Sequence, residues 1–228
     1  MQLFYLSKQY HHWLPQIHVD FHEQGYNEPY YFAPAAEPIH QAVTPWQREF
    51  QTIVGKNNAK YFDENGWQYF TKERFDLLYP SYGDTYPLYN GAIGMTYEQG
   101  GIRAGLAIVT NDGDTLTLKD RIEHHFTTSM ATLETVANHS DRLIEEFRKY
   151  FQQSAANPPG NYKTYIVKAQ NISRLRKLAN LLNKNNIAYS FGADKTLNGY
   201  NYETQKLENF KVERNDLIIN LQQPRSVL

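Results

Sequence analysis

An alternation of apolar and polar residues between positions 16 and 22 predicts a β-strand, because successive side chains of a strand point to opposite sides. Its two sides are Ile17, Val19 and Phe21, and His18, Asp20 and His22. We expect this strand to end at His22, where a loop with glycine, asparagine and proline begins. Titratable groups on one side of an otherwise apolar strand are costly to bury without partners, so this side is a candidate for chemistry.

A second strand is predicted over residues 92–98 and is expected to end at Glu98, ahead of an exit turn at Gly100 and Gly101. In open α/β sheets, ligands collect at the carboxyl ends of strands. His22 and Glu98 each stand at such a predicted end, and we find no comparable pair in the sequence. They are therefore the main candidates for functional residues.

Helical periodicity predicts a helix from Thr44, where Thr44 can cap and Pro45 suits the first turn. The strongest helical signal follows later, as one apolar stripe of the kind that packs on a core: Leu118, Ile122, Phe126, Met130, Leu133 and Ala137. A companion helix is predicted from Ser140 or Asp141, with these side chains directed inward: Leu143, Ile144, Phe147 and Phe151.

A polar, proline-containing stretch predicts a linker at residues 153–161. Beyond it, a strand, a helix and two further strands are predicted: 162–167, 172–183, 187–191 and 217–221. We therefore expect an α/β protein. Residues 1–152 would form one domain, and a small βαβ-type domain would occupy residues 162–228.

Composition narrows the function classes. A net charge of −1 gives no field for nucleic acid or membrane surfaces, and no apolar run reaches the ~20 residues of a membrane span. The first residues lack the basic n-region and the long apolar h-region that are typical of a signal peptide, and the absence of cysteine excludes disulfides and thiolate metal sites. Eight of the 18 tyrosines cluster at 26–31 and 79–97, which suits either pockets for peptides or sugars or the covering of core edges.

A metal-assisted reaction would use both an imidazole ligand and a carboxylate base. A catalytic zinc needs three protein ligands, and the sequence contains neither HxxE nor HExxH. His18 and His22 would lie roughly 13 Å apart along a strand. Glu37 and His40 fall in a proline-rich loop. The residues alone therefore supply one credible ligand, and a lone histidine at a strand end is more often a structural residue.

Several motifs resemble the downstream half of zinc carboxypeptidases of the M14 family, over roughly residues 1–152. They are His22-Glu-Gln-Gly25 with Tyr30-Tyr-Phe-Ala-Pro34, then Tyr79-Pro-Ser-Tyr-Gly-Asp-Thr85, and Gly94-Met-Thr-Tyr-Glu98. The resemblance implies that residues 1–152 are the C-terminal part of a catalytic domain, with a mostly parallel mixed sheet and helices on both faces. The small domain at 162–228 would then be a truncated accessory domain. The resemblance also implies that His22 is a zinc ligand and Glu98 the general base that activates water. It also implies a peptide or peptide-like substrate, with Tyr79 or Tyr82 closing over its terminal residue and Tyr79 slightly preferred.

The sequence also departs from that family. The HxxE motif with the first two zinc ligands is missing, and Arg103 is the nearest substitute for the family's substrate-binding arginines. We therefore expect a piece of a longer enzyme with one Zn²⁺ in the intact parent. The chain alone is expected to have weak or no zinc affinity and no activity. By the same resemblance, the parent would be periplasmic or secreted.

Two other classes of protein remain open. A carbohydrate-active or carbohydrate-binding domain would use the tyrosine-rich loops with Asp20, Glu23 and Glu98 as carboxylates, although Asp20 and Glu23 fall on opposite strand faces. A non-catalytic interaction module would bind a partner through exposed aromatic residues. Because a half-sheet exposes an apolar edge, we also expect the isolated chain to self-associate.

Overall fold

The computed structural model describes residues 9–158 and 160–228. The chain divides into two compact units, one of Leu14–Lys149 and one of Tyr150–Leu228 together with the N-terminal residues to Trp13. Both units contain strands and helices, so the chain is a mixed α/β protein. No helix among the described residues is long and apolar enough to cross a membrane.

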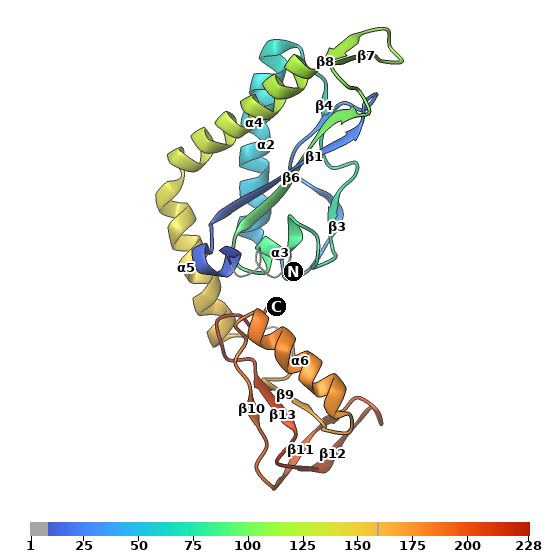
Figure 1. Ribbon diagram of the computed structural model, residues 1–228. Coiled ribbons are helices and arrows are strands. Elements are labelled where there is room, and N and C mark those ends of the chain that lie inside the picture. Colours follow the sequence, from blue (N-terminus) through green and yellow to red (C-terminus); the bar gives the residue numbers. More distant parts are fainter. Residues whose placement is uncertain (1–8, 159) are drawn as a thin grey trace. The chain divides into compact units, whose positions relative to one another are not determined.

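The main sheet of the first unit has four strands in the order β1-β6-β2-β4. They are β1 Ile17–Gly25, β6 Ile93–Ile102, β2 Tyr30–Tyr31 and β4 Tyr69–Phe70. The long strands β1 and β6 run parallel side by side (Figure 1), β2 is antiparallel to β6, and β4 is parallel to β2. The sheet is therefore mixed, with β1 at one edge.

Both long strands continue past the ends that the sequence predicted. β1 runs on to Gly25 and β6 to Ile102, so His22 and Glu98 lie within their strands, and Gly100 and Gly101 do not form an exit turn. A Cβ on Gly100 would lie 2.3 Å from the Glu28 carbonyl oxygen, and one on Gly101 would lie 2.5 Å from Glu23 Oε1. These glycines therefore permit close packing rather than a change of direction.

Two helices pack against one side of this sheet, α2 Pro45–Asn65 and α4 Leu118–Asn138. α2 begins at a capping box between Thr44 and Gln47, which confirms the predicted cap, and it ends at Gly66 with a φ of 67°. The core between helix and sheet combines aromatic and aliphatic side chains from both: Tyr30, Phe32, Phe50, Val54, Phe62, Ile93, Met95 and Tyr97. Because the apolar side chains of β1 and β6 are buried against the helices, the polar side chains of these strands lie on the opposite side of the sheet.

The apolar stripe predicted for α4 does not face this core. Most of it is exposed, namely Leu118, Ile122, Phe126, Met130 and Leu133. The buried side of α4 instead carries small and polar residues, which find partners on the sheet: Thr128 and Thr132 hydrogen-bond the hydroxyls of Tyr30 (3.0 Å) and Tyr97 (2.6 Å). The companion helix α5 Ser140–Ala156 likewise buries Leu143 but exposes Ile144.

The opposite side of the sheet was expected to carry helices of its own. It carries a loop and the single-turn helix α3 Thr85–Leu88, which contacts β6. Two small pairs of strands complete the unit: β3 Ala36–Ile39 lies parallel to β5 Asp76–Leu77, and β7 Ala107–Val109 is antiparallel to β8 Thr115–Thr117. The thin cover leaves part of this side open to solvent.

The second unit contains the predicted strand, helix and later strands, with shifted bounds. They are β9 Thr164–Val167, α6 Ile172–Lys184, β10 Ser190–Phe191 and β13 Leu217–Asn220, with β13 between β10 and β9 and antiparallel to both. The predicted linker is too long, because α5 continues to Ala156. The sequence analysis missed the hairpin of β11 Lys195–Asn201 and β12 Lys206–Val212, whose mostly polar residues carry no apolar period.

Candidate functional site

The parallel pairing of β1 and β6 places His22 directly opposite Glu98. Alternate residues of the two strands share one side of the sheet, away from the core that α2 and α4 cover. We call this side the polar face, made of His18, Asp20, His22, Thr96 and Glu98. The fold therefore brings together the two residues that the sequence analysis singled out, although they lie 76 positions apart in the chain.

Glu98 is largely buried, with 8% of its surface exposed. Among the described residues, its carboxylate has no hydrogen-bond partner. Burial raises the pKa of Glu98 above its ordinary value of 4.5, and the charges of Asp20 and Asp84 raise it further, while His22 and Arg74 lower it. The residue as a whole is buried, but its carboxylate oxygens are not among the described side-chain atoms that are both buried and unpaired. A carboxylate whose pKa is raised by burial and by neighbouring charges is a candidate for a functional group.

His22 is half-exposed and is held by its neighbour on β1. Its Nε2 lies 3.0 Å from Asp20 Oδ2, and this hydrogen bond is the main reason why the pKa of His22 is raised above 6.5. No described residue hydrogen-bonds the Nδ1 of His22. A carboxylate on one ring nitrogen fixes the orientation of an imidazole and leaves the other nitrogen to bind a ligand, which is the usual arrangement of a metal-binding histidine.

The two histidines of the polar face are expected to titrate on opposite sides of pH 6.5. Burial lowers the pKa of His18, whereas the hydrogen bond to Asp20 raises that of His22. An NMR titration of the imidazole protons should therefore give a higher midpoint for His22. Asp20→Asn should move the His22 midpoint back towards 6.5. A midpoint of His22 below that of His18 would contradict the geometry.

The raised pKa of His22 makes the stability of the fold depend on pH. Because the pKa of His22 is higher in the folded state, its contribution to stability is complete below pH 6.5 and is lost as the pH rises through the folded-state value. The contribution of Glu98 to stability also decreases as the pH rises, because a raised carboxyl pKa favours the folded state while the group is protonated.

Asp84, which the sequence analysis did not select, fixes a loop to the polar face. Only 6% of it is exposed, and its carboxylate accepts hydrogen bonds from Thr96 (2.9 Å) and Thr85 (3.1 Å). Two glycines permit the close approach: a Cβ on Gly83 would lie 1.9 Å from Asp20 Oδ2, and one on Gly94 would lie 1.8 Å from the Asp84 carbonyl oxygen. Gly83 and Asp84 therefore lie directly against β1 and β6.

Tyr79 and Tyr82 belong to this loop, and both are exposed with their ring centroids 5.4 Å apart. Tyr82 lies two positions before Asp84, the residue that is held on the polar face. Arg103 lies elsewhere: it follows the end of β6 with a φ of 69°, about 16 Å beyond Glu98 along the strand direction. The described arginine whose charge lowers the pKa of Glu98, together with that of His22, is Arg74, which pairs with Glu28 and which sequence spacing gave no reason to select.

Other polar candidates have structural roles. Glu23 points to the α4 side and pairs with the buried Arg121 at 3.0 Å, so it forms no carboxylate pair with Asp20 of the kind a carbohydrate-active site would use. His124 bonds Gln99 Oε1 through Nδ1 (2.8 Å), and His125 bonds the Tyr30 hydroxyl (2.7 Å). Burial lowers the pKa of both, that of His124 to about 4.

The described residues do not fit a catalytic zinc ion by themselves. No group of three or more His, Cys, Asp or Glu in residues 9–158 and 160–228 is placed to hold a metal ion, and a catalytic zinc takes three protein ligands. The polar face offers His22, with its orienting carboxylate, as a single imidazole ligand. Comparison with family models, curated proteins and solved structures finds no match to this chain.

Proposed function

We propose that the polar face is the general-base half of a hydrolytic site of the zinc-carboxypeptidase type, acting on a peptide or peptide-like amide. The observation that carries the proposal is the register of β1 and β6, which sets the His22 imidazole opposite the buried Glu98 carboxylate. The resemblance of the motifs around both residues to M14 carboxypeptidases supports the choice of reaction.

Glu98 is the proton acceptor in this proposal. A general base works best when its pKa approaches the working pH, and burial moves the pKa of Glu98 in that direction. Its carboxylate has no partner among the described residues that would compete for its lone pairs. It would take a proton from the attacking water and return it to the departing amine.

His22 would be the one metal ligand that this chain contributes. Asp20 orients its ring through Nε2 and leaves Nδ1 for the ion. The two further ligands required would come from a polypeptide segment outside residues 1–228. The described residues by themselves do not complete the coordination of a metal ion.

Substrate would be held by the loop at 79–84. Asp84 fixes one end of this loop through Thr96, and the exposed rings of Tyr79 and Tyr82 are available to cover a terminal residue. Covering the substrate excludes water and restricts its orientation, and both effects increase the rate of a hydrolytic step.

Zinc binding by the purified chain tests the assignment of a single ligand. We expect 1–228 to bind Zn²⁺ weakly in isothermal titration calorimetry, because one imidazole cannot hold a catalytic ion. The residual binding should fall in His22→Gln and persist in the control His139→Gln, whose imidazole bonds the Thr135 carbonyl instead. Tight stoichiometric uptake by the wild-type chain would show that further ligands are present and would contradict the proposal.

A further inference from the structure

Strand β1 lies at one edge of the main sheet of the first unit. Among the described strands of its sheet, β1 pairs with β6 alone. The Gln16 carbonyl oxygen accepts a hydrogen bond from Ile93 N at 2.8 Å, so even-numbered residues of β1 direct their backbone groups to β6. Ile17, Val19 and Phe21 therefore direct theirs away from β6. An edge of this kind is a template for pairing with another strand.

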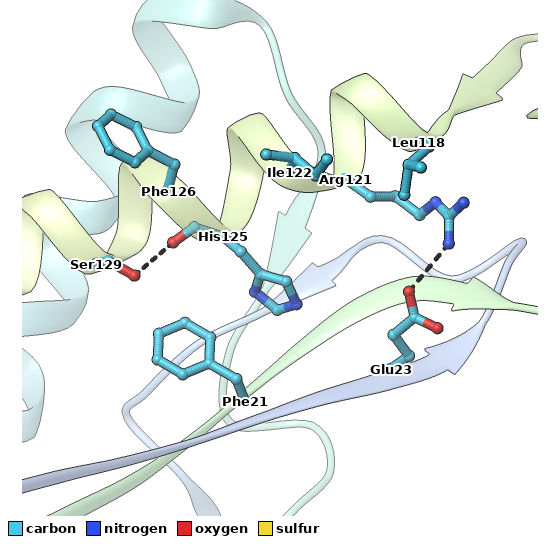
Figure 2. Close-up of a pocket in the computed structure, with 8 residues that line it drawn as sticks. All are labelled: Phe21, Glu23, Leu118, Arg121, Ile122, His125, Phe126 and Ser129. Atoms are coloured by element: carbon cyan, nitrogen blue, oxygen red, sulfur yellow. Dashed lines mark hydrogen bonds and ion pairs between the residues drawn. The ribbon is translucent and has the colours of Figure 1, made fainter. Parts of the chain in front are cut away.

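The surface beside this edge is apolar and open. Phe21 of β1 faces α4 across a groove of about 410 Å³, which is also lined by Ile122 and Phe126 (Figure 2). Phe126 is 64% exposed, and it belongs to the unburied stripe of α4 described above. The Phe21 ring packs edge to face on His125 of that helix, at 5.1 Å between centroids, and on Tyr97 of β6, at 5.4 Å. Exposed apolar side chains thus follow an unpaired strand edge.

We propose that this edge binds a second copy of the chain, with the two β1 strands antiparallel and Val19 opposite Val19 of the partner copy. In this register the residue numbers of opposed positions sum to 38. Only even sums place the outward-directed, odd-numbered residues opposite one another, as a ladder of exchanged N–H and C=O bonds requires. The possible registers are therefore two residues apart.

The side chains favour the sum of 38 over the sums of 40 and 42. In the register with a sum of 38, Ile17 of one copy lies opposite Phe21 of the other, and Val19 lies opposite Val19. His18 of one copy then lies opposite Asp20 of the other. A sum of 40 would set Asp20 against Asp20, and like charges directly opposite are destabilising. A sum of 42 would set Val19 against the carboxylate of Glu23, which already pairs with Arg121. Self-complementary chemistry along the edge is the reason to assign a second copy rather than another partner.

The same arrangement covers the groove. Antiparallel pairing at an edge relates the copies by a two-fold axis perpendicular to the sheet, so the α4 helices lie on the same side of the combined sheet. The exposed residues Ile122 and Phe126 next to the edge would then meet their counterparts across the axis. One contact therefore satisfies both the backbone groups of β1 and the apolar side chains of α4.

Cysteine cross-linking tests the register directly, because the chain contains no cysteine. Val19→Cys should give a disulfide-linked dimer on mild oxidation, since directly opposed residues have Cα atoms about 5.5 Å apart. Phe21→Cys is the matched control: the two copies of that residue would be about 13 Å apart, too far for a disulfide. A cross-link in Phe21→Cys, or none in Val19→Cys, would overturn the proposal.

Sedimentation equilibrium tests the association itself. The wild-type chain should be a dimer, and Phe126→Lys should weaken dimerisation by about tenfold or more, because it places a charge at the centre of the apolar contact. Leu207→Lys, at a residue 70% exposed on β12 of the other unit, should leave the dimer unchanged. Circular dichroism melts would confirm that both variants fold. A wild-type monomer at all concentrations, or equal behaviour of the two variants, would contradict the proposal.

Discussion

Replacing Glu98 by glutamine is expected to reduce hydrolysis of a C-terminal peptide bond by a factor of about 10²–10⁴ or more. The substitution keeps the size of the side chain and removes its ability to accept a proton. The assay requires a polypeptide in which an HxxE-bearing segment precedes residue 1, so that the ligand set is complete. The change should appear in kcat, because the base acts in the transition state rather than in substrate binding.

The control for this experiment is Glu37→Gln. Glu37 lies on β3, and its exposed carboxylate pairs with Arg48 on the surface, so its loss should leave turnover unchanged. Zinc content should be equal in the wild type and both variants. Turnover of Glu98→Gln within a few-fold of the wild type would contradict the assignment of Glu98 as the base.

Substitution of Gly94 by alanine is expected to cost about 1–3 kcal/mol of folding stability, or more. The added Cβ would lie 1.8 Å from the Asp84 carbonyl oxygen, and neither the strand nor the loop backbone can move aside without losing contacts. We expect the loop at 79–84 to separate from the polar face. Chemical denaturation measures the loss, and hydrogen exchange should become faster at residues 79–84.

Gly25→Ala provides the comparison at the end of the neighbouring strand. Its Cβ would come no closer than 3.7 Å to Glu28 Cγ, which is an ordinary contact, so the stability should change little. If Gly94→Ala were as stable as Gly25→Ala, the close packing of Asp84 against β6 would be wrong, and with it the anchoring of the tyrosine loop.

The sequence was sufficient to predict β1, β6 and their two faces, because side-chain alternation is a local property of a strand. It did not predict where the strands end. Gly100 and Gly101 read locally as a turn, but they lie within β6 and make room for Glu28 and Glu23 from elsewhere in the chain. Requirements of this kind depend on tertiary neighbours, which the local sequence does not contain.

The orientation of α4 shows a second limit. Its apolar period predicted the packed face, yet the buried residues are largely threonines, an alanine and Arg121. They are buried because the hydroxyls of Tyr30 and Tyr97 and the carboxylate of Glu23 provide partners. The hydrophobic period in this helix instead marks a surface that remains exposed in the described chain.

The candidate site was predictable in part. His22 and Glu98 could be selected from strand patterns and from family resemblance, whereas Asp84 and Arg74 lie in loops whose positions only the fold determines. Arg103 was selected for its nearness in sequence, and sequence distance along a strand translates into real separation. Charges that act on Glu98 could thus be identified only from the three-dimensional arrangement.

The most direct test of the account is the pKa of Glu98 with and without its neighbour, measured by NMR titration of the side-chain carboxyl in residues 1–228. The charge of protonated His22 lowers the pKa of Glu98. The pKa of Glu98 should lie above 4.5 in the wild type and rise further in His22→Gln, with no change in His40→Gln. A pKa that did not respond to the loss of His22 would mean that imidazole and carboxylate do not share one site.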